Sequence, residues 1–81
     1  MKIEIFTTPT CMYCQKTKEY FKEHSVKYTE HDVTKDSSAA RKMIENTGQQ
    51  GVPVIVIDND WDNAIIGFDK EGIEKALRKK S

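Results

Sequence analysis

Two cysteines separated by two residues are the part of this sequence best suited to chemistry. Cys11 and Cys14 flank Met12 and Tyr13, and the 81-residue sequence contains no other cysteine. Two cysteines are too few for the disulfide framework that stabilises small secreted domains. A single close pair instead indicates thiol–disulfide exchange or metal binding.

The cysteine pair lies where a strand is predicted to give way to a helix. Residues 2–6 alternate between polar and apolar side chains, as strands do, and a Thr-Thr-Pro-Thr segment then interrupts the alternation. Cys14, Thr17 and Phe21 follow at helical spacing, and the helix is expected to end near His24. The junction between strand and helix therefore falls at the first cysteine.

A sulfur at the start of a helix is placed for nucleophilic chemistry. The thiolate, rather than the thiol, attacks a disulfide. The first turn of a helix offers unpaired N–H groups and the positive end of the helix dipole, both of which favour an anion. We therefore predict that Cys11 is the thiolate nucleophile. Cys14 lies one turn inward, so it should be more buried and should attack a mixed disulfide formed on Cys11.

The remaining elements predict how this junction is supported. Further strands are expected over residues 26–33, 54–57 and 61–66, and further helices are expected after the capping residues of 34–38 and after Asp69. The expected buried residues of these helices are Ala40, Met43, Ile44 and Thr47 in the second, which stops before Gly48, and Ile73, Ala76 and Leu77 in the third.

The order of these elements predicts an α/β fold. A strand–helix–strand start requires a parallel pair joined by a right-handed crossover, and the last two strands can form a hairpin. We expect a βαβαββα arrangement, in which a four-stranded mixed sheet carries helices on both faces. The length allows a single domain over residues 1–81.

Composition and charge exclude several classes of function. Lys plus Arg and Asp plus Glu both number 13, so the formal net charge is zero, and no dense basic cluster indicates nucleic-acid binding. The longest apolar stretch, residues 54–57, is far shorter than the roughly 18 residues of a membrane span. The N-terminal stretch is too short and too interrupted for a signal peptide. We expect a cytoplasmic protein that binds neither nucleic acid nor membranes.

Three motifs together resemble the glutaredoxin family over nearly the whole chain. Residues 5–14, Ile-Phe-Thr-Thr-Pro-Thr-Cys-Met-Tyr-Cys, look like the first strand and active-site turn of that family. Gly51-Val52-Pro53 stands where the family has Thr-Val-Pro with a cis proline, and Gly67-Phe68-Asp69 stands where it has a glycine-rich glutathione-binding turn. The resemblance implies a thioredoxin fold, a cis Val52–Pro53 bond and thiol–disulfide oxidoreductase activity.

The resemblance also implies roles for individual residues. Cys11 matches the nucleophilic cysteine and Cys14 the resolving cysteine. Glutathione is the implied co-substrate, with no tightly bound cofactor. The residues implied to contact glutathione are Tyr13, Thr8, Gln49, Val52, Pro53, Gly67, Phe68 and Asp69. The backbone of Val52 would pair with the cysteinyl part, as in strand addition, and Phe68 and Asp69 would hold the γ-glutamyl end.

The sequence departs from the family pattern at several of these positions. Met12 replaces a proline, and Thr8 stands where many glutathione-dependent members have a lysine. Gln49 takes the Arg or Gln position, and Ile66 precedes Gly67 where a second glycine is usual. Because a charge that would bind a glutathione carboxylate is missing, the chain also resembles the small NrdH-like redoxins, which accept electrons from thioredoxin reductase and serve ribonucleotide reductase.

Several partners and one other class of function therefore stay open. The expected partners of a monomer are glutathione and disulfide-containing or glutathionylated proteins, with thioredoxin reductase or ribonucleotide reductase as alternatives. Cys11, Cys14, His24 and His31 could also offer four metal ligands, but their intervals miss zinc-finger spacing, and no metal site is expected. An iron–sulfur cluster shared between two chains through Cys11 and glutathione, as in some glutaredoxins, is a further alternative, as is a binding module with a structural disulfide.

Overall fold

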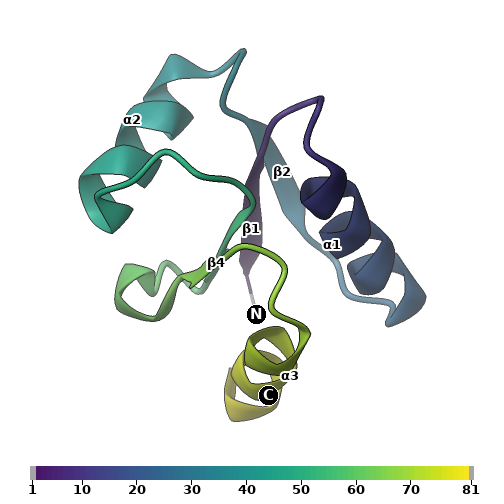
Figure 1. Ribbon diagram of the computed structural model, residues 1–81. Helices are drawn as coiled ribbons and strands as arrows, with labels where there is room; N and C mark the ends of the chain where they lie inside the picture. Colours follow the sequence, from purple (N-terminus) through teal and green to yellow (C-terminus); the bar gives the residue numbers. More distant parts are fainter. Residues whose placement is uncertain (1, 81) are drawn as a thin grey trace.

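A four-stranded mixed sheet forms the centre of the part of the chain, residues 2–80, that the computed structural model describes (Figure 1). Its strands are β1 (Ile3–Thr7), β2 (Thr29–Asp32), β3 (Val54–Ile57) and β4 (Ile65–Ile66), in the order β2-β1-β3-β4. β1 runs parallel to β2 and antiparallel to β3, and β4 runs antiparallel to β3. The predicted crossover pair and final hairpin are both confirmed.

Helices cover both faces of this sheet, as predicted. They are α1 (Met12–Glu23), α2 (Ser37–Thr47) and α3 (Lys70–Lys80), and α1 and α2 lie on opposite sides of the strands (Figure 1). α1 and α3 share one face, because side chains from both pack into the same cluster. None of the described helices has the length and apolar character needed to cross a membrane.

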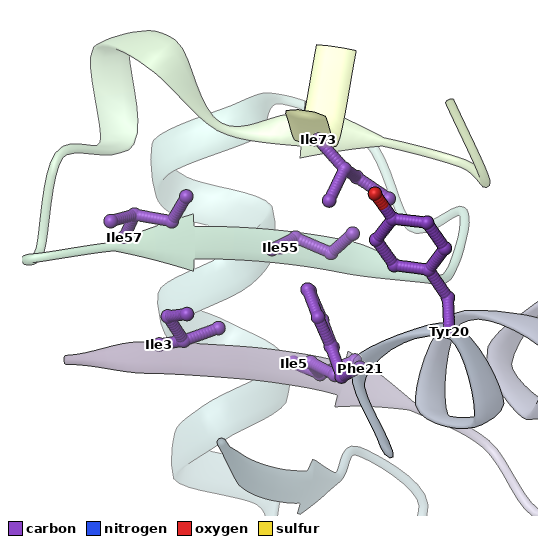
Figure 2. Close-up of a cluster of buried hydrophobic side chains, with 7 residues drawn as sticks. All are labelled: Ile3, Ile5, Tyr20, Phe21, Ile55, Ile57 and Ile73. Carbon is purple, nitrogen blue, oxygen red and sulfur yellow. The ribbon is translucent and has the colours of Figure 1, made fainter. Parts of the chain in front are cut away.

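The face under α1 and α3 holds the larger hydrophobic core. Alternate residues of a strand point to the same side, so β1 and β3 each present two isoleucines to these helices. Figure 2 shows this cluster, which consists of Ile3, Ile5, Ile55 and Ile57 from the strands, Tyr20 and Phe21 from α1, and Ile73 from α3. Phe21 and Ile73 are fully buried. This packing holds α1 and α3 against the sheet.

The opposite face of the sheet packs against α2. Phe6, Val54 and Val56 point to this side and contact Ala39 and Met43. All four residues of β3 are buried, as expected of a strand covered on both faces. The ring of Trp61 extends this core, with its centroid 5.2 Å from that of Phe6.

The buried face of α2 differs from the expected one. Ala39 and Met43 are buried, whereas Ile44, expected inside, is 38% exposed. The carboxylate of Asp36 accepts a hydrogen bond from the Ala39 N–H at 3.1 Å, and the helix begins at Ser37. Residues 39 and 43, which are one turn apart, are the ones that pack against the bulky side chains of this sheet face. Gly48, in the left-handed conformation at φ 70°, ends the helix as predicted.

Two strands are shorter than expected. The second spans Thr29–Asp32 rather than 26–33, because the backbone before it returns to α1 with a 2.8 Å hydrogen bond from Val26 N–H to the Phe21 carbonyl. The last spans Ile65–Ile66 rather than 61–66. Residues Trp61–Asn63 instead form a short 3₁₀ turn, supported by a 2.8 Å hydrogen bond from the Asn63 side chain to the Asp60 carboxylate.

Candidate active site

Cys11 is the N-cap residue of α1. Its backbone is extended, and its sulfur accepts a hydrogen bond from the Cys14 backbone N–H at 3.0 Å. That N–H belongs to the first turn, where no carbonyl within the helix can pair with it. The N–H group and the helix dipole both favour negative charge on this sulfur. The strand-to-helix junction predicted from the sequence is therefore confirmed, and the partly exposed Cys11 thiol stands at it.

Cys14 is a buried thiol directly behind Cys11. Its residue is 1% exposed, and both cysteines are free. Burial, together with the hydrogen bond to Cys11, raises the pKa of Cys14 to about 12, against the ordinary value of 9.0, whereas a backbone hydrogen bond from Thr8 and the charge of Lys18 act in the opposite direction. At neutral pH Cys14 therefore holds its proton.

The loop before β3 forms the opposite wall of the site. The Val52 carbonyl oxygen lies 3.8 Å from the Cys11 sulfur, and the Val52–Pro53 bond is cis, which confirms the expectation drawn from the family resemblance. The carbonyl of Pro53 accepts a hydrogen bond of 2.8 Å from the Gly67 N–H. Gly67 has a φ of 85°, which favours glycine. The fold thus brings Cys11, Val52, Pro53 and Gly67 together.

Exposed apolar side chains flank the reactive thiol. Met12 is 74% exposed and Tyr13 is 59% exposed, although both are large hydrophobic residues at the start of α1. The Lys16 ammonium lies 5.4 Å from the centre of the Tyr13 ring, a cation–π distance. Thr8, on the other side of the cysteine, accepts the Cys11 N–H through its carbonyl at 3.3 Å.

The remaining sequence-predicted contacts are occupied by their own chain. The Gln49 amide donates to the Gly51 carbonyl at 3.0 Å and accepts the Gly51 N–H at 2.5 Å. The Asp69 carboxylate accepts the Gly72 N–H at 3.1 Å at the start of α3. The Phe68 ring packs 6.3 Å from that of Tyr20.

The two histidines lie apart from the cysteines. His24 ends α1 and packs its ring 4.2 Å from that of Tyr20. His31, on β2, lies 3.0 Å from a carboxylate oxygen of Glu4. Within residues 2–80, no three His, Cys, Asp or Glu side chains are grouped closely enough to hold a metal ion. The four-ligand arrangement considered as an alternative is therefore not assembled.

A polar cluster beside Cys14 could not be identified from the sequence. One carboxylate oxygen of Glu30, on β2, lies 2.8 Å from the Thr7 hydroxyl and 2.9 Å from the Lys18 ammonium. The sequence offered one partial signal, since Lys18 follows Cys14 by one helical turn. The partner of Lys18, Glu30, lies on a strand distant in the sequence, and its contact with Thr7 depends on the register between β1 and β2.

Comparisons with known proteins agree with this geometry. A family model described as glutaredoxin matches residues 3–61. A glutaredoxin-like 8.6 kDa protein in the rubredoxin operon of Clostridium pasteurianum is 42% identical over 77 residues, which cover 95% of this chain and 99% of that protein.

Solved structures show the same fold. A variant of the thioredoxin-like protein BC3987 superimposes with a TM-score of 0.85 at 32% identity, covering 95% of both chains. The glutaredoxin-like NrdH-redoxin from Escherichia coli gives a TM-score of 0.80 at 23% identity over 93% of each chain, a likeness of fold. The chain belongs to the glutaredoxin family, as a glutaredoxin-like redoxin of thioredoxin fold with its Cys-x-x-Cys pair at Cys11 and Cys14.

Proposed function

We propose that this protein is a cytoplasmic thiol–disulfide oxidoreductase that reduces protein disulfides and glutathione mixed disulfides. One observation carries the proposal: the partly exposed Cys11 sulfur accepts the Cys14 N–H at the start of α1, while the Cys14 thiol is buried and protonated. This asymmetry makes the Cys11 sulfur the nucleophile and leaves the Cys14 thiol protonated until a mixed disulfide has formed. A chain whose two cysteines form one Cys-x-x-Cys pair, without a disulfide framework, fits a compartment in which glutathione keeps cysteines reduced.

The first step is attack on the substrate disulfide. The Cys11 thiolate forms a bond to one substrate sulfur and expels the other as a thiolate, which leaves a mixed disulfide on Cys11. Val52 stands beside the reacting sulfur, with its carbonyl 3.8 Å away, so its backbone can pair with an extended substrate segment. Pro53 and Gly67 hold that loop in place through their backbone hydrogen bond.

The second step is resolution by Cys14. Once Cys11 is bonded to substrate, the Cys11 charge that helps to raise the pKa of Cys14 is no longer present. Cys14 then loses its proton and attacks the Cys11 sulfur. The bond to the substrate breaks, the substrate thiolate leaves and takes up a proton, and the protein ends as a Cys11–Cys14 disulfide, oxidised by two electrons.

With a glutathione mixed disulfide, Cys11 alone can complete the cycle. It takes the glutathionyl group, and a second glutathione regenerates the Cys11 thiolate and leaves as glutathione disulfide. The proposed contacts are those of the family motifs: Tyr13, Thr8, Gln49, Val52, Pro53, Gly67, Phe68 and Asp69. No tightly bound cofactor is needed, because glutathione is the co-substrate.

A second candidate is reduction by a flavin-dependent thioredoxin reductase, as in NrdH-like redoxins. Three observations favour it. Thr8 offers no charge to a glutathione carboxylate, and the Gln49 amide is held by Gly51. The exposed Met12 and Tyr13 side chains offer apolar contact to a protein partner beside the disulfide.

The electron donor is tested by supplying each reductant separately. The oxidised protein is incubated with NADPH, glutathione and glutathione reductase, or with NADPH and thioredoxin reductase, and NADPH consumption is followed. Rapid consumption in the first mixture supports the glutathione-dependent enzyme, and consumption in the second alone supports the NrdH-like alternative. Consumption in neither mixture, or equal consumption by a Cys11→Ser variant, would contradict the oxidoreductase.

A further inference from the structure

The Glu30 carboxylate joins three elements, one of which, α1, carries the buried Cys14 thiol. It lies on β2, accepts the hydroxyl of Thr7 at the end of β1 at 2.8 Å, and pairs with the ammonium of Lys18 on α1 at 2.9 Å. Thr7 is 1% exposed, so its hydroxyl depends on this bond. The side chains of Lys18 and Glu30 are 24% and 38% exposed, so the pair stands at the edge of the interior.

Two routes connect this pair to Cys14. Lys18 follows Cys14 by one turn on the same face of α1, the spacing at which helical side chains are neighbours. Thr7 precedes Thr8, whose backbone hydrogen-bonds the Cys14 sulfur. The ionisable groups that face this corner are Cys11 and Lys18 of α1, Glu30 and Asp32 of β2, and Tyr28 just before β2.

The positive charge of Lys18 favours the Cys14 thiolate, which is the form that attacks in the resolving step. A buried thiol ionises with difficulty, and a nearby cation offsets part of that cost. The Lys18 charge lowers the pKa of Cys14, against the larger effect of burial. The hydrogen bond to Glu30 raises the pKa of Lys18, so the ammonium stays charged at neutral pH. Glu30 thus holds the cation in place while its own negative charge weakens the cation's field.

We propose that Lys18 is a positioning residue for the resolving step, held by Glu30 and Thr7 where its positive charge favours the Cys14 thiolate as that sulfur attacks the mixed disulfide on Cys11. The inference rests on the proposed function. Cys14 gives up its proton to solvent, its sulfur bonds to the Cys11 sulfur, and the bond from Cys11 to the substrate breaks. The substrate sulfur leaves with the electron pair and is then protonated. Lys18 is not consumed in this step.

An aromatic disulfide whose released thiolate is coloured separates the two steps. When the reduced protein is mixed with dithiobis(nitrobenzoate) in a stopped-flow instrument, attack by Cys11 releases one nitrobenzoate thiolate, and resolution by Cys14 releases the second. The first phase therefore reports the nucleophile and the second reports the resolving thiol. A Cys14→Ser variant, which should release only the first equivalent, identifies the phases.

Lys18→Gln removes the charge with little change in length. We expect it to slow the second phase at pH 7 by roughly threefold or more, the size expected for a partly screened charge, and to leave the first phase unchanged. It should also move the pH profile of the second phase to higher pH. Lys18→Arg should restore the rate. Lys22→Gln, at an exposed lysine further along α1, is the matched control and should change neither phase.

The Glu30→Gln variant distinguishes an electrostatic role of Lys18 from a purely structural one. Both Lys18→Gln and Glu30→Gln break the same ion pair, so a purely structural role predicts that both slow resolution. The electrostatic role predicts that Glu30→Gln resolves no more slowly than the unaltered protein. The amide oxygen introduced there can still accept the hydrogen bonds of Thr7 and Lys18 that hold the cation, while the Lys18 charge is less compensated.

Three outcomes would overturn the inference: equal slowing by both variants, an unchanged second phase in Lys18→Gln, or equal slowing of both phases by Lys18→Gln. A failure of the proposed function would look different, because the unaltered protein would then show no fast first phase.

Discussion

The Cys11 sulfur lies 3.8 Å from the Val52 carbonyl oxygen, although 41 residues separate them in the chain. The sheet explains the contact. β1 and β3 are antiparallel neighbours, and Phe6 near the end of β1 pairs with Val54 at the start of β3. The segment that follows β1 and the segment that precedes β3 therefore leave the sheet at the same end of the strands. The site is assembled by strand pairing, with α1 supplying the hydrogen bond to the sulfur.

Replacing the proposed nucleophile should remove all exchange activity. Cys11→Ser keeps the shape of the N-cap but substitutes an alcohol, which does not ionise at neutral pH. We expect turnover with either reductant to fall by roughly a thousandfold or more. The measurement is NADPH consumption in the coupled assays, with circular dichroism to show that the variant is folded. Substantial remaining activity would assign the nucleophile elsewhere.

Replacing the resolving thiol should separate the two proposed routes. Cys14→Ser leaves Cys11 able to exchange glutathione, so reduction of a glutathionylated peptide should stay within roughly tenfold of the unaltered protein. Reduction of a protein disulfide by the dithiol route should be lost, because no second sulfur can release the substrate. Mass spectrometry should find the variant trapped as a mixed disulfide. Equal loss of both activities would refute the monothiol route.

The buried thiol should make stability fall in alkaline solution. Burial raises the pKa of Cys14 to about 12 from 9.0, so the folded state holds this proton more tightly than the unfolded chain does. The stabilisation is complete below pH 9.0 and is lost as the pH rises towards 12. Denaturant titrations of the reduced protein from neutral pH to about pH 10.5 should show this decline, and Cys14→Ser should flatten it. Identical slopes would show that another group is responsible.

Periodicity in the sequence predicted some elements well, because their apolar residues fit only one buried arrangement. In α1, Thr17 and Phe21 recur at helical spacing and are buried, and the unbroken apolar run of β3 required cover on both sides. Periodicity failed for α2, where residues 39, 40, 43 and 44 are all apolar, so two neighbouring faces fit the pattern and packing against the sheet decides which one turns inward. The sequence predicts a strand over 61–66, whereas residues 61–63 form a 3₁₀ turn, because the local Asn63–Asp60 hydrogen bond that supports the turn leaves no periodic pattern.

Some features of the candidate site could likewise be predicted from the sequence, and others could not. The cysteine pair is local, so its chemistry could be predicted from spacing and from the expected helix start. The cis state of Pro53 followed from the family resemblance and not from the residues alone. The contact between Glu30 and Lys18 requires the register of β2 on β1 and the packing of α1, which no short segment encodes.

Two adjacent residues of α2 test the corrected helix phase. Met43 is 1% exposed against the sheet, whereas Ile44 is 38% exposed. Met43→Ala should lower the free energy of unfolding by about 2–5 kcal/mol, because it opens a cavity in the core. Ile44→Ala should cost less than about 1 kcal/mol, since alanine favours the helix and little packing is lost. Denaturant unfolding measures both, and equal losses would contradict this orientation of the helix.

Competitive alkylation of the reduced protein shows which of the two cysteines is the nucleophile. The structure assigns a reactive sulfur to the partly exposed N-cap of α1 and a protonated, buried sulfur to the position behind it. With limiting iodoacetamide at pH 7, tandem mass spectrometry should locate the label on Cys11, with less than about a tenth on Cys14. Equal labelling of the two cysteines, or faster labelling of Cys14, would contradict the account.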